Sequence, residues 1–198
     1  KGGDHAVTLQ SRKARKGGQW KAEEGGETAP TPAEAAKEKD IVLCCGGRDP
    51  DRREVTLGAN GAFAARKKGA LFVDHTTASA SIARELALAA EKGGFDFVDA
   101  PVSGGQAGAV NGKLGIMCGG TEAGYAKAEP VMAVYTKLAK RLGPAGAADG
   151  CGGAVFPGGG VRAEGVRGSG RVVTRKFWLD GEHPAEPIVA KWRAGDFQ

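Results

Sequence analysis

Residues 99–120, DAPVSGGQAGAVNGKLGIMCGG, decide how this chain folds and what it can bind. The stretch leaves an apolar segment, passes through a proline and a serine, and contains seven glycines. Glycine inside a helix or strand costs about 0.5–1 kcal/mol relative to alanine, and a turn needs only one or two glycines. We therefore expect the bare backbone of this stretch to admit a ligand at close range.

Short apolar runs alternate with helical patterns around this stretch. Helices are expected in several of the intervening segments, including DPDRREVTL and a helix capped by Ser79 or Ser81 that runs to about Lys92. Strands are expected at HAVTL (5–9), IVLCC (41–45), ALFVD (70–74), FDFVDA (95–100) and LGIMCGG (114–120). This alternation predicts an α/β fold with a mostly parallel sheet and right-handed crossovers.

The composition and apolar periodicity of the sequence change in the C-terminal part of the chain. TEAGYAKAEPVMAVYTKLAKRL, residues 121–142, predicts mainly helix with an interruption at Pro130. After about Gly146 the sequence becomes rich in glycine and arginine and has no sustained apolar period. We expect a folded domain over residues 1–147 and a disordered or irregular tail over residues 148–198, because such a tail buries too little apolar surface to offset its ordering entropy.

Composition excludes several classes of protein. The 198 residues carry a net charge of +5, and 41% are hydrophobic, which is typical of a globular domain. Basic residues are spread out, apart from RKARK at 12–16, and aromatics are few, so no nucleic-acid partner is expected. Without a long apolar run or a signal-peptide pattern, we expect a cytoplasmic protein with no membrane partner. Cys44, Cys45, Cys118 and Cys151 lack metal-ligand spacing, which predicts buried reduced thiols and no metal site.

Polar and glycine residues follow three of the expected strands. They are Gly46 and Gly47 after IVLCC, Thr76 and Thr77 after ALFVD, and Ser103, Gly104 and Gly105 after FDFVDA. In an open parallel sheet, ligands bind outside the carboxyl ends of the strands. Hydroxyls and bare amides there suit an anionic or polyhydroxylated ligand. Tight turns and helix caps explain the first two groups equally well when each is taken alone.

DAPVSGGQAGAVNGKLGIMCGG closely resembles the substrate-binding signature of the β-hydroxyacid dehydrogenases, typified by 3-hydroxyisobutyrate dehydrogenase. The resemblance extends upstream through DHTTASASIARELALAAEKGGFDFVDA and downstream through KAEPVMAVYTKLAKRLGPAGA, covering roughly residues 5–147. It implies a Rossmann-like domain and a hydride transfer between NAD(P) and a small 3-hydroxy acid. It also implies that Ser103, Gly104 and Gly105 receive the substrate carboxylate.

The resemblance also implies a set of cofactor contacts. Gly46, Gly47 and Asp51 match contacts after one strand, and Thr77 matches a contact after the next. Arg12 stands where the family's second strand ends in Asn-Arg. An arginine there pairs with a 2′-phosphate and favours NADP, whereas Ser11 replaces the asparagine and a solvated basic face is the other reading, so NAD stays open.

The sequence departs from the family pattern at both ends. No Gly-rich loop precedes HAVTL, so we expect the sheet to lack its first strand through N-terminal truncation. The position of the family's catalytic lysine falls on Gly152, and no lysine lies between Lys140 and Lys176. The sequence after Ala147 does not match the family's helical domain, which builds its homo-oligomer. A shifted reading frame near Ala147 is one hypothesis for that change.

The leading functional expectation is an NAD(P)-dependent oxidoreductase acting on a 3-hydroxyisobutyrate-like acid. Two alternatives stay open, of which the missing lysine and pyrophosphate loop favour the first. One is a catalytically silent ligand-binding or interaction domain, and the other is an inert gene fragment.

Overall fold

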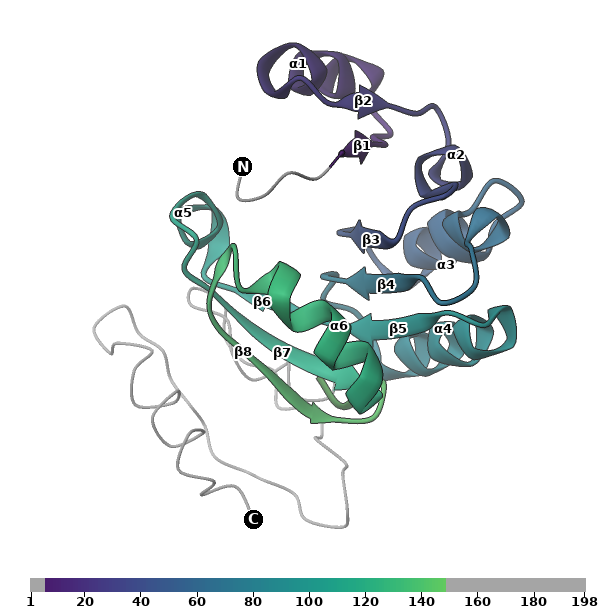
Figure 1. Cartoon of the computed structure of the whole chain (residues 1–198), viewed down its shortest axis with the longest axis vertical. Helices are drawn as coiled ribbons and strands as arrows, with labels where there is room; N and C mark the ends of the chain where they lie inside the picture. The colour runs from purple at the N-terminus through teal and green to yellow at the C-terminus, as the bar shows by residue number, and fades with distance from the viewer. Residues whose placement is uncertain (1–5, 149–198) are drawn as a thin grey trace. The chain divides into compact units, whose positions relative to one another are not determined.

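The computed structural model describes residues 6–148 (Figure 1). Helices and strands alternate through most of this part of the chain, as the sequence predicts. In chain order they are β1 (Thr8–Leu9), α1 (Ala14–Glu24), β2 (Glu27–Thr28), α2 (Pro32–Ala36), β3 (Ile41–Cys44), α3 (Asp49–Leu57), the 3-10 helix η1 (Ala62–Ala65), β4 (Leu71–Asp74), α4 (Ala80–Gly93), β5 (Asp96–Asp99), β6 (Val102–Ser103), α5 (Gly105–Val110), β7 (Leu114–Gly120), α6 (Glu122–Met132) and β8 (Thr136–Gly143).

The main sheet has the strand order β3-β4-β5-β7-β6, and β8 also pairs with β7. β3, β4 and β5 run parallel, and β8 runs parallel to β7. β7 runs antiparallel to both β5 and β6. β1 and β2 form a separate parallel pair, so within residues 6–148 β3 pairs with β4 alone and Leu43 on it stays 49% exposed. The predicted α/β fold with a mostly parallel sheet is confirmed.

The central strands are apolar on both faces. On β4, Phe72 packs into a cluster with α4, whereas its neighbours Leu71 and Val73 pack into a second cluster with α6. Side chains alternate across a strand, so a parallel strand covered on both faces reads as a continuous apolar run. This explains why apolar residues stand at consecutive positions in β4 (LFVD) and β5 (DFVD), and Figure 1 shows α4 and α6 on opposite faces of the sheet.

A serine cap and a glycine fix the two ends of helix α4, and its buried residues recur at helical spacing. The Ser79 hydroxyl accepts a hydrogen bond from the amide of Ile82 at 3.3 Å, which caps the first turn, so the cap is Ser79 and not Ser81. Gly94 ends the helix in the left-handed conformation with a φ of +72°. The buried residues of α4 are Ile82, Ala83, Leu86 and Ala90.

The mainly helical prediction for residues 121–142 is wrong in its second half. Helix α6 ends at Met132, and Thr136–Gly143 forms β8 along β7. The spacing of Leu138 and Leu142 imitates a helix. Irregularities in the pairing with β7 shift the register twice and break the two-residue alternation that would have indicated a strand.

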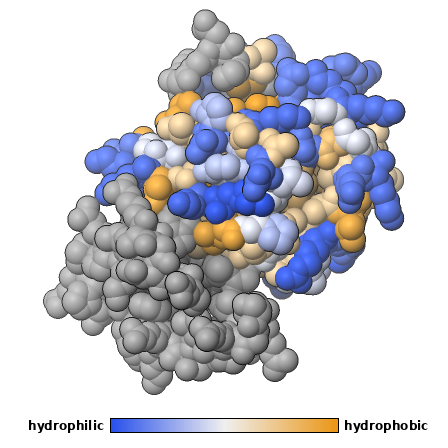
Figure 2. Space-filling model, turned by 60° about the horizontal axis from the view of Figure 1, so that its bottom comes forward, coloured by the Kyte–Doolittle hydropathy of each residue, from blue (hydrophilic) through white to orange (hydrophobic). Residues whose placement is uncertain are grey.

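The remaining expectations concern the C-terminal tail and the contact of the chain with membranes. Apart from Ala148, the expected irregular tail at 148–198 lies outside the described residues. No helix in residues 6–148 is long and apolar enough to cross a membrane. On the face drawn in Figure 2, hydrophobic patches are separated by hydrophilic residues.

Leu86→Ala tests the packing of α4. Leu86 is 0% exposed, so the substitution should lower the free energy of unfolding by about 2–5 kcal/mol through lost burial and the cavity that remains. Leu88→Ala on the same helix is the control, because Leu88 is 59% exposed and its loss should change stability by less than about 0.5 kcal/mol. Urea denaturation measures both, and equal losses would contradict this packing.

Candidate cofactor and substrate site

The carboxyl ends of three parallel strands meet at one edge of the sheet. Cys44 on β3 pairs with Asp74 on β4, and Asp74 pairs with Asp99 on β5. The loops that follow therefore leave the sheet at the same level. This edge, which we call the rim, brings together Gly46, Thr77 and the start of the loop leading to Ser103, as the sequence predicts.

The first rim loop is held by a buried threonine. The amide of Gly46 donates a hydrogen bond to Oγ1 of Thr76 at 2.8 Å, and Thr76 is only 3% exposed. Thr77, the predicted cofactor contact, is exposed. Thr76 therefore holds the protein's own backbone, whereas Thr77 next to it is exposed.

Asp51 lies at the start of α3, where it already has partners within the protein. Its Oδ2 accepts a hydrogen bond from the amide of Arg48 at 3.1 Å, which caps the helix, and its Oδ1 lies 3.3 Å from Nη1 of Arg12. A Cβ on Gly47 would lie 2.3 Å from Asp51 Oδ2, so glycine is required there for this close approach. The structure therefore gives Gly47 and Asp51 a local structural role.

Arg12 follows β1 and belongs to the basic cluster identified in the sequence. Its side chain is 73% exposed, and Asp51 is the carboxylate beside it. Exposed ion pairs contribute little to stability because solvent screens them. The guanidinium is thus accessible to an anionic group at this end of the rim.

An ion pair between Arg52 and Asp74 lies beneath the rim, and both side chains are 0% exposed. The other oxygen of Asp74, Oδ1, accepts a hydrogen bond from the amide of Thr76 at 2.9 Å. A continuous chain of contacts therefore runs from Arg52 through Asp74 and Thr76 to Gly46. Sequence reasoning missed Arg52, because a charged residue in the run DRRE reads as part of a solvated helix face.

A second polar contact ties α3 to α4. Oδ1 of Asp49 accepts a hydrogen bond from the Ser79 amide at 3.1 Å, and its Oδ2 accepts one from the Ser79 hydroxyl. Burial raises the pKa of Asp49, but these two hydrogen bonds and the positive charges of Arg52 and Arg53 together hold the pKa below its ordinary value. The helix that follows the first rim loop is thereby fixed to the helix that follows the second.

The candidate substrate loop extends beyond the rim. Ser103 at the end of β6 pairs with Gly115, whereas Asp99 pairs with Gly119 on the same strand β7. Four residues of strand place Ser103 about 13 Å past the end of β5. Ser103 is half-buried, and neither Gly105 nor Gly115 has any atom within 4 Å of where a Cβ would stand. Open space therefore borders this loop.

Backbone conformation explains two of the candidate glycines. Gly104 has a φ of +119° and Gly105 a φ of +58°, a region that side-chain-bearing residues rarely adopt. A Cβ on Gly104 would also lie 3.3 Å from Leu114. Both positions require glycine whether or not a ligand binds.

The cysteines fit the predicted buried thiols only in part. Cys118 is buried, which raises the pKa of its thiol to about 12, but Cys45 is exposed because β3 lies at the side of the sheet. Cys151 lies outside the described residues, as does Gly152 at the family's lysine position. Across residues 6–148, no group of three His, Cys, Asp or Glu side chains could hold a metal ion.

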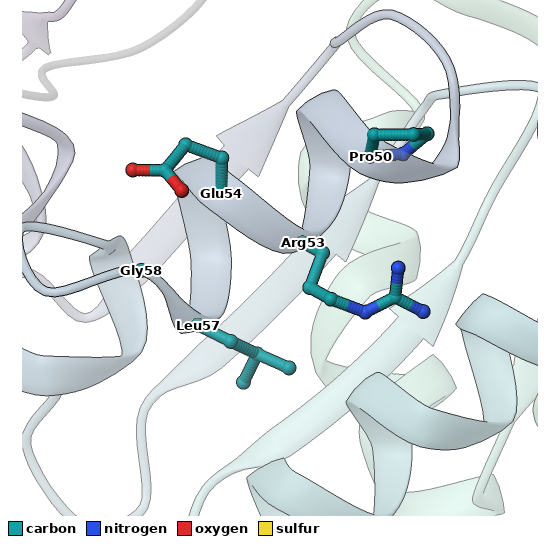
Figure 3. A pocket seen from close by; sticks show the side chains of 5 residues that line it. All are labelled: Pro50, Arg53, Glu54, Leu57 and Gly58. Atoms are coloured by element: carbon teal, nitrogen blue, oxygen red, sulfur yellow. The ribbon is translucent and has the colours of Figure 1, made fainter.

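A shallow hollow of about 370 Å³ lies on the outer side of α3 (Figure 3). Arg53 and Leu57 extend on the same side of the helix in this view, and Arg53 donates two hydrogen bonds to Glu85. The lining contains none of the predicted site residues. The rim, and not this hollow, is the candidate site.

Comparison with known proteins gives one family. The family model for the NAD binding domain of 6-phosphogluconate dehydrogenase matches residues 1–145. An uncharacterized oxidoreductase of Shewanella frigidimarina is 48% identical over 143 residues, 72% of this chain and 49% of that protein. The mitochondrial 3-hydroxyisobutyrate dehydrogenase of Mus musculus is 40% identical over 110 residues, 56% of this chain and 33% of that protein. The chain spans about half the length, or less, of these curated relatives.

Solved structures show the same fold. A 3-hydroxyisobutyrate dehydrogenase of Mycobacterium tuberculosis, solved with L-serine, has a TM-score of 0.68 and 30% identity, covering 76% of this chain and 52% of that chain. A 3-hydroxyisobutyrate dehydrogenase of Salmonella typhimurium has a TM-score of 0.69 at 23% identity, covering 75% and 52%. The Rossmann-like prediction is confirmed.

Arg52→Met tests the buried ion pair. Removing the guanidinium leaves the Asp74 carboxylate buried without its cationic partner, so the free energy of unfolding should fall by about 3–5 kcal/mol. Arg53→Met is the matched control, because its ion pair with Glu85 is half exposed and its loss should have a much smaller effect. Chemical denaturation compares the two, and a smaller loss for Arg52→Met than for Arg53→Met would contradict the role of the pair.

Proposed function

The chain belongs to the family of the NAD binding domain of 6-phosphogluconate dehydrogenase, and we propose that its rim binds NADP or NAD beside a small 3-hydroxy acid. The supporting observation is the meeting of three strand ends at the rim, with the exposed Thr77 on one loop and the open space at Gly105 on another. This arrangement suits an oxidoreductase of the β-hydroxyacid dehydrogenase type.

The residues around the rim fit a dinucleotide. Gly46 is exposed and presents no side chain, so a ligand can approach its backbone, and Thr77 on the next rim loop is exposed as well. Arg12 supplies an accessible positive charge for a 2′-phosphate, which favours NADP. When bound, the nicotinamide supplies the acceptor or donor of a hydride.

The loop of residues 103–105 is assigned to the substrate carboxylate. The Ser103 hydroxyl and the amides of Gly104 and Gly105 can all donate to one carboxylate, and charge-assisted hydrogen bonds of this kind are strong. Their role is to orient the acid so that its hydroxyl-bearing carbon faces the cofactor.

A second candidate function follows from the need for a group that accepts a proton. Oxidation of a hydroxy acid needs a group that accepts the hydroxyl proton, and Gly152 stands where the family has its lysine. That substitution favours a ligand-binding domain that does not turn over. Binding measurements together with an assay of NADPH formation distinguish the two functions, and absence of all binding would indicate an inert fragment and overturn both.

Arg12→Ala tests the cofactor preference. Calorimetric titration of the full chain should show NADPH binding weakened about tenfold by loss of a charged hydrogen bond, with NADH binding unchanged within about twofold. Arg15→Ala, in the same basic cluster, should leave both affinities unchanged. Equal losses in the two variants would mean that general positive charge, and not a 2′-phosphate contact, governs binding.

Ser103→Ala tests the substrate contact. With NADPH saturating, binding of 3-hydroxyisobutyrate should weaken about tenfold or more, because one of the three proposed donors to the carboxylate is lost. Ser81→Ala, an exposed serine on α4, serves as the control and should bind like the unaltered chain. An unchanged affinity in Ser103→Ala would remove Ser103 from the site.

A further inference from the structure

His75 connects the second rim loop to the candidate substrate loop. It follows β4 directly, and its imidazole makes two hydrogen bonds. Nδ1 lies 2.8 Å from the carbonyl oxygen of Ala100, and Nε2 lies 2.9 Å from the hydroxyl of Tyr135. The two rings meet edge to face, with centroids 5.6 Å apart. Neither residue was singled out by its sequence pattern.

The partners of the imidazole determine where its proton lies. A carbonyl oxygen can only accept a hydrogen bond, so Nδ1 must carry the proton and donate to Ala100. Burial lowers the pKa of His75, which favours the neutral ring, although the Ala100 contact and Asp74 act in the opposite direction. In a neutral imidazole with the proton on Nδ1, Nε2 accepts, and the Tyr135 hydroxyl donates to it.

Ala100 is the point where β5 passes into the candidate substrate loop. It is 0% exposed, and its amide donates a hydrogen bond to the carbonyl of Asp74 at 2.7 Å. Its carbonyl is held by His75, and Pro101 follows with a fixed φ. Hydrogen bonds at both the amide and the carbonyl of Ala100 therefore fix the direction in which the chain leaves the sheet toward Ser103.

Tyr135, which lies just before β8, reaches His75 from a different part of the fold. The amide of Leu114 at the start of β7 donates to the carbonyl of Tyr135 at 3.3 Å, and Leu114 lies next to Gly115, the partner of Ser103. Tyr135 thus links the start of β7, next to the residue that pairs with Ser103, to the residue that follows β4.

We propose that His75 is a positioning residue for the substrate loop 101–105, because its Nδ1 holds the Ala100 carbonyl, and that Tyr135 keeps the imidazole in the orientation that makes this contact. In the opposite tautomer the lone pair of Nδ1 would face the lone pairs of the Ala100 carbonyl, and the contact would become repulsive. The proposal rests on the proposed function only in naming the ligand of this loop as a carboxylate.

Tyr135→Phe tests this anchoring, because it keeps the aromatic ring and removes the hydroxyl that holds Nε2. An imidazole that turns away from Ala100 is no longer required to carry its proton on Nδ1. Nitrogen NMR of the imidazole in the full chain should show the proton on Nδ1 in the unaltered protein, and a mixture of Nδ1 and Nε2 protonation in the variant. Tyr125→Phe is the matched control. Its hydroxyl binds Glu129 and the carbonyl of Ala139, so its loss should leave the His75 tautomer unchanged.

Hydrogen exchange measures the base of the loop. In Tyr135→Phe the amides of Ala100 and Met117, which donate to the carbonyls of Asp74 and Pro101 where the loop leaves the sheet, should exchange about tenfold faster, while those in the middle of α4 keep their rates. His75→Leu should do the same, and His75→Asn should restore protection because its amide nitrogen can donate to Ala100 in place of Nδ1. Unchanged tautomer and exchange in Tyr135→Phe, or equal exchange in His75→Leu and His75→Asn, would overturn the proposal.

Ligand binding provides the third readout. Tyr135→Phe should weaken binding of 3-hydroxyisobutyrate several-fold, with the affinity for NADPH held within about twofold. If the unaltered chain binds no acid, the proposed function fails, while the NMR and exchange results still decide the role of His75. An unweakened acid affinity in a variant whose Ala100 and Met117 amides exchange faster would overturn the link between the loop and the carboxylate.

Discussion

The buried ion pair of Arg52 and Asp74 is the constraint on which the rim depends. Removing two charges from water carries a large desolvation cost, which attraction at short range offsets only when the geometry is good. Apolar side chains of similar size would fill the same space without that cost. A carboxylate at the end of β4, however, also holds the Thr76 amide and through it Gly46. The pair thus fixes the path of two loops that an apolar contact would leave free to shift.

The glycines of residues 99–120 have more than one cause. A Cβ on Gly119 would lie 2.5 Å from the carboxylate of Asp99, and one on Gly104 would press against Leu114, so the protein's own atoms require glycine at both positions. Gly105 borders open space but has a positive φ that itself favours glycine, whereas Gly115 borders open space without one. Close internal packing and backbone conformation therefore account for several of these glycines, and the expectation that the run admits a ligand stays a prediction.

Local patterns predicted the elements whose signals are local. The apolar runs that became β3, β4, β5 and β7, the helix DPDRREVTL, and a serine cap at Ser79 or Ser81 all follow from neighbours in the sequence, and the structure selects Ser79. What failed depends on distant contacts. β8 is a strand because it lies along β7, and Arg52 is buried because Asp74 meets it from another element. The contacts of His75 with Ala100 and Tyr135 span 25 and 60 positions and have no local signature.

The position of β3 has a consequence for handling the protein in solution. Along one side, within residues 6–148, its backbone donors and acceptors have no strand partner, and the half-exposed Leu43 and exposed Cys45 lie on or beside it. Such an edge is a ready template for pairing with another polypeptide, and natural proteins usually blunt it with charge, proline or a covering element. Among the residues that the structure describes, β3 contains no charge or proline and has no strand beyond it, so this edge is where a further polypeptide strand can pair.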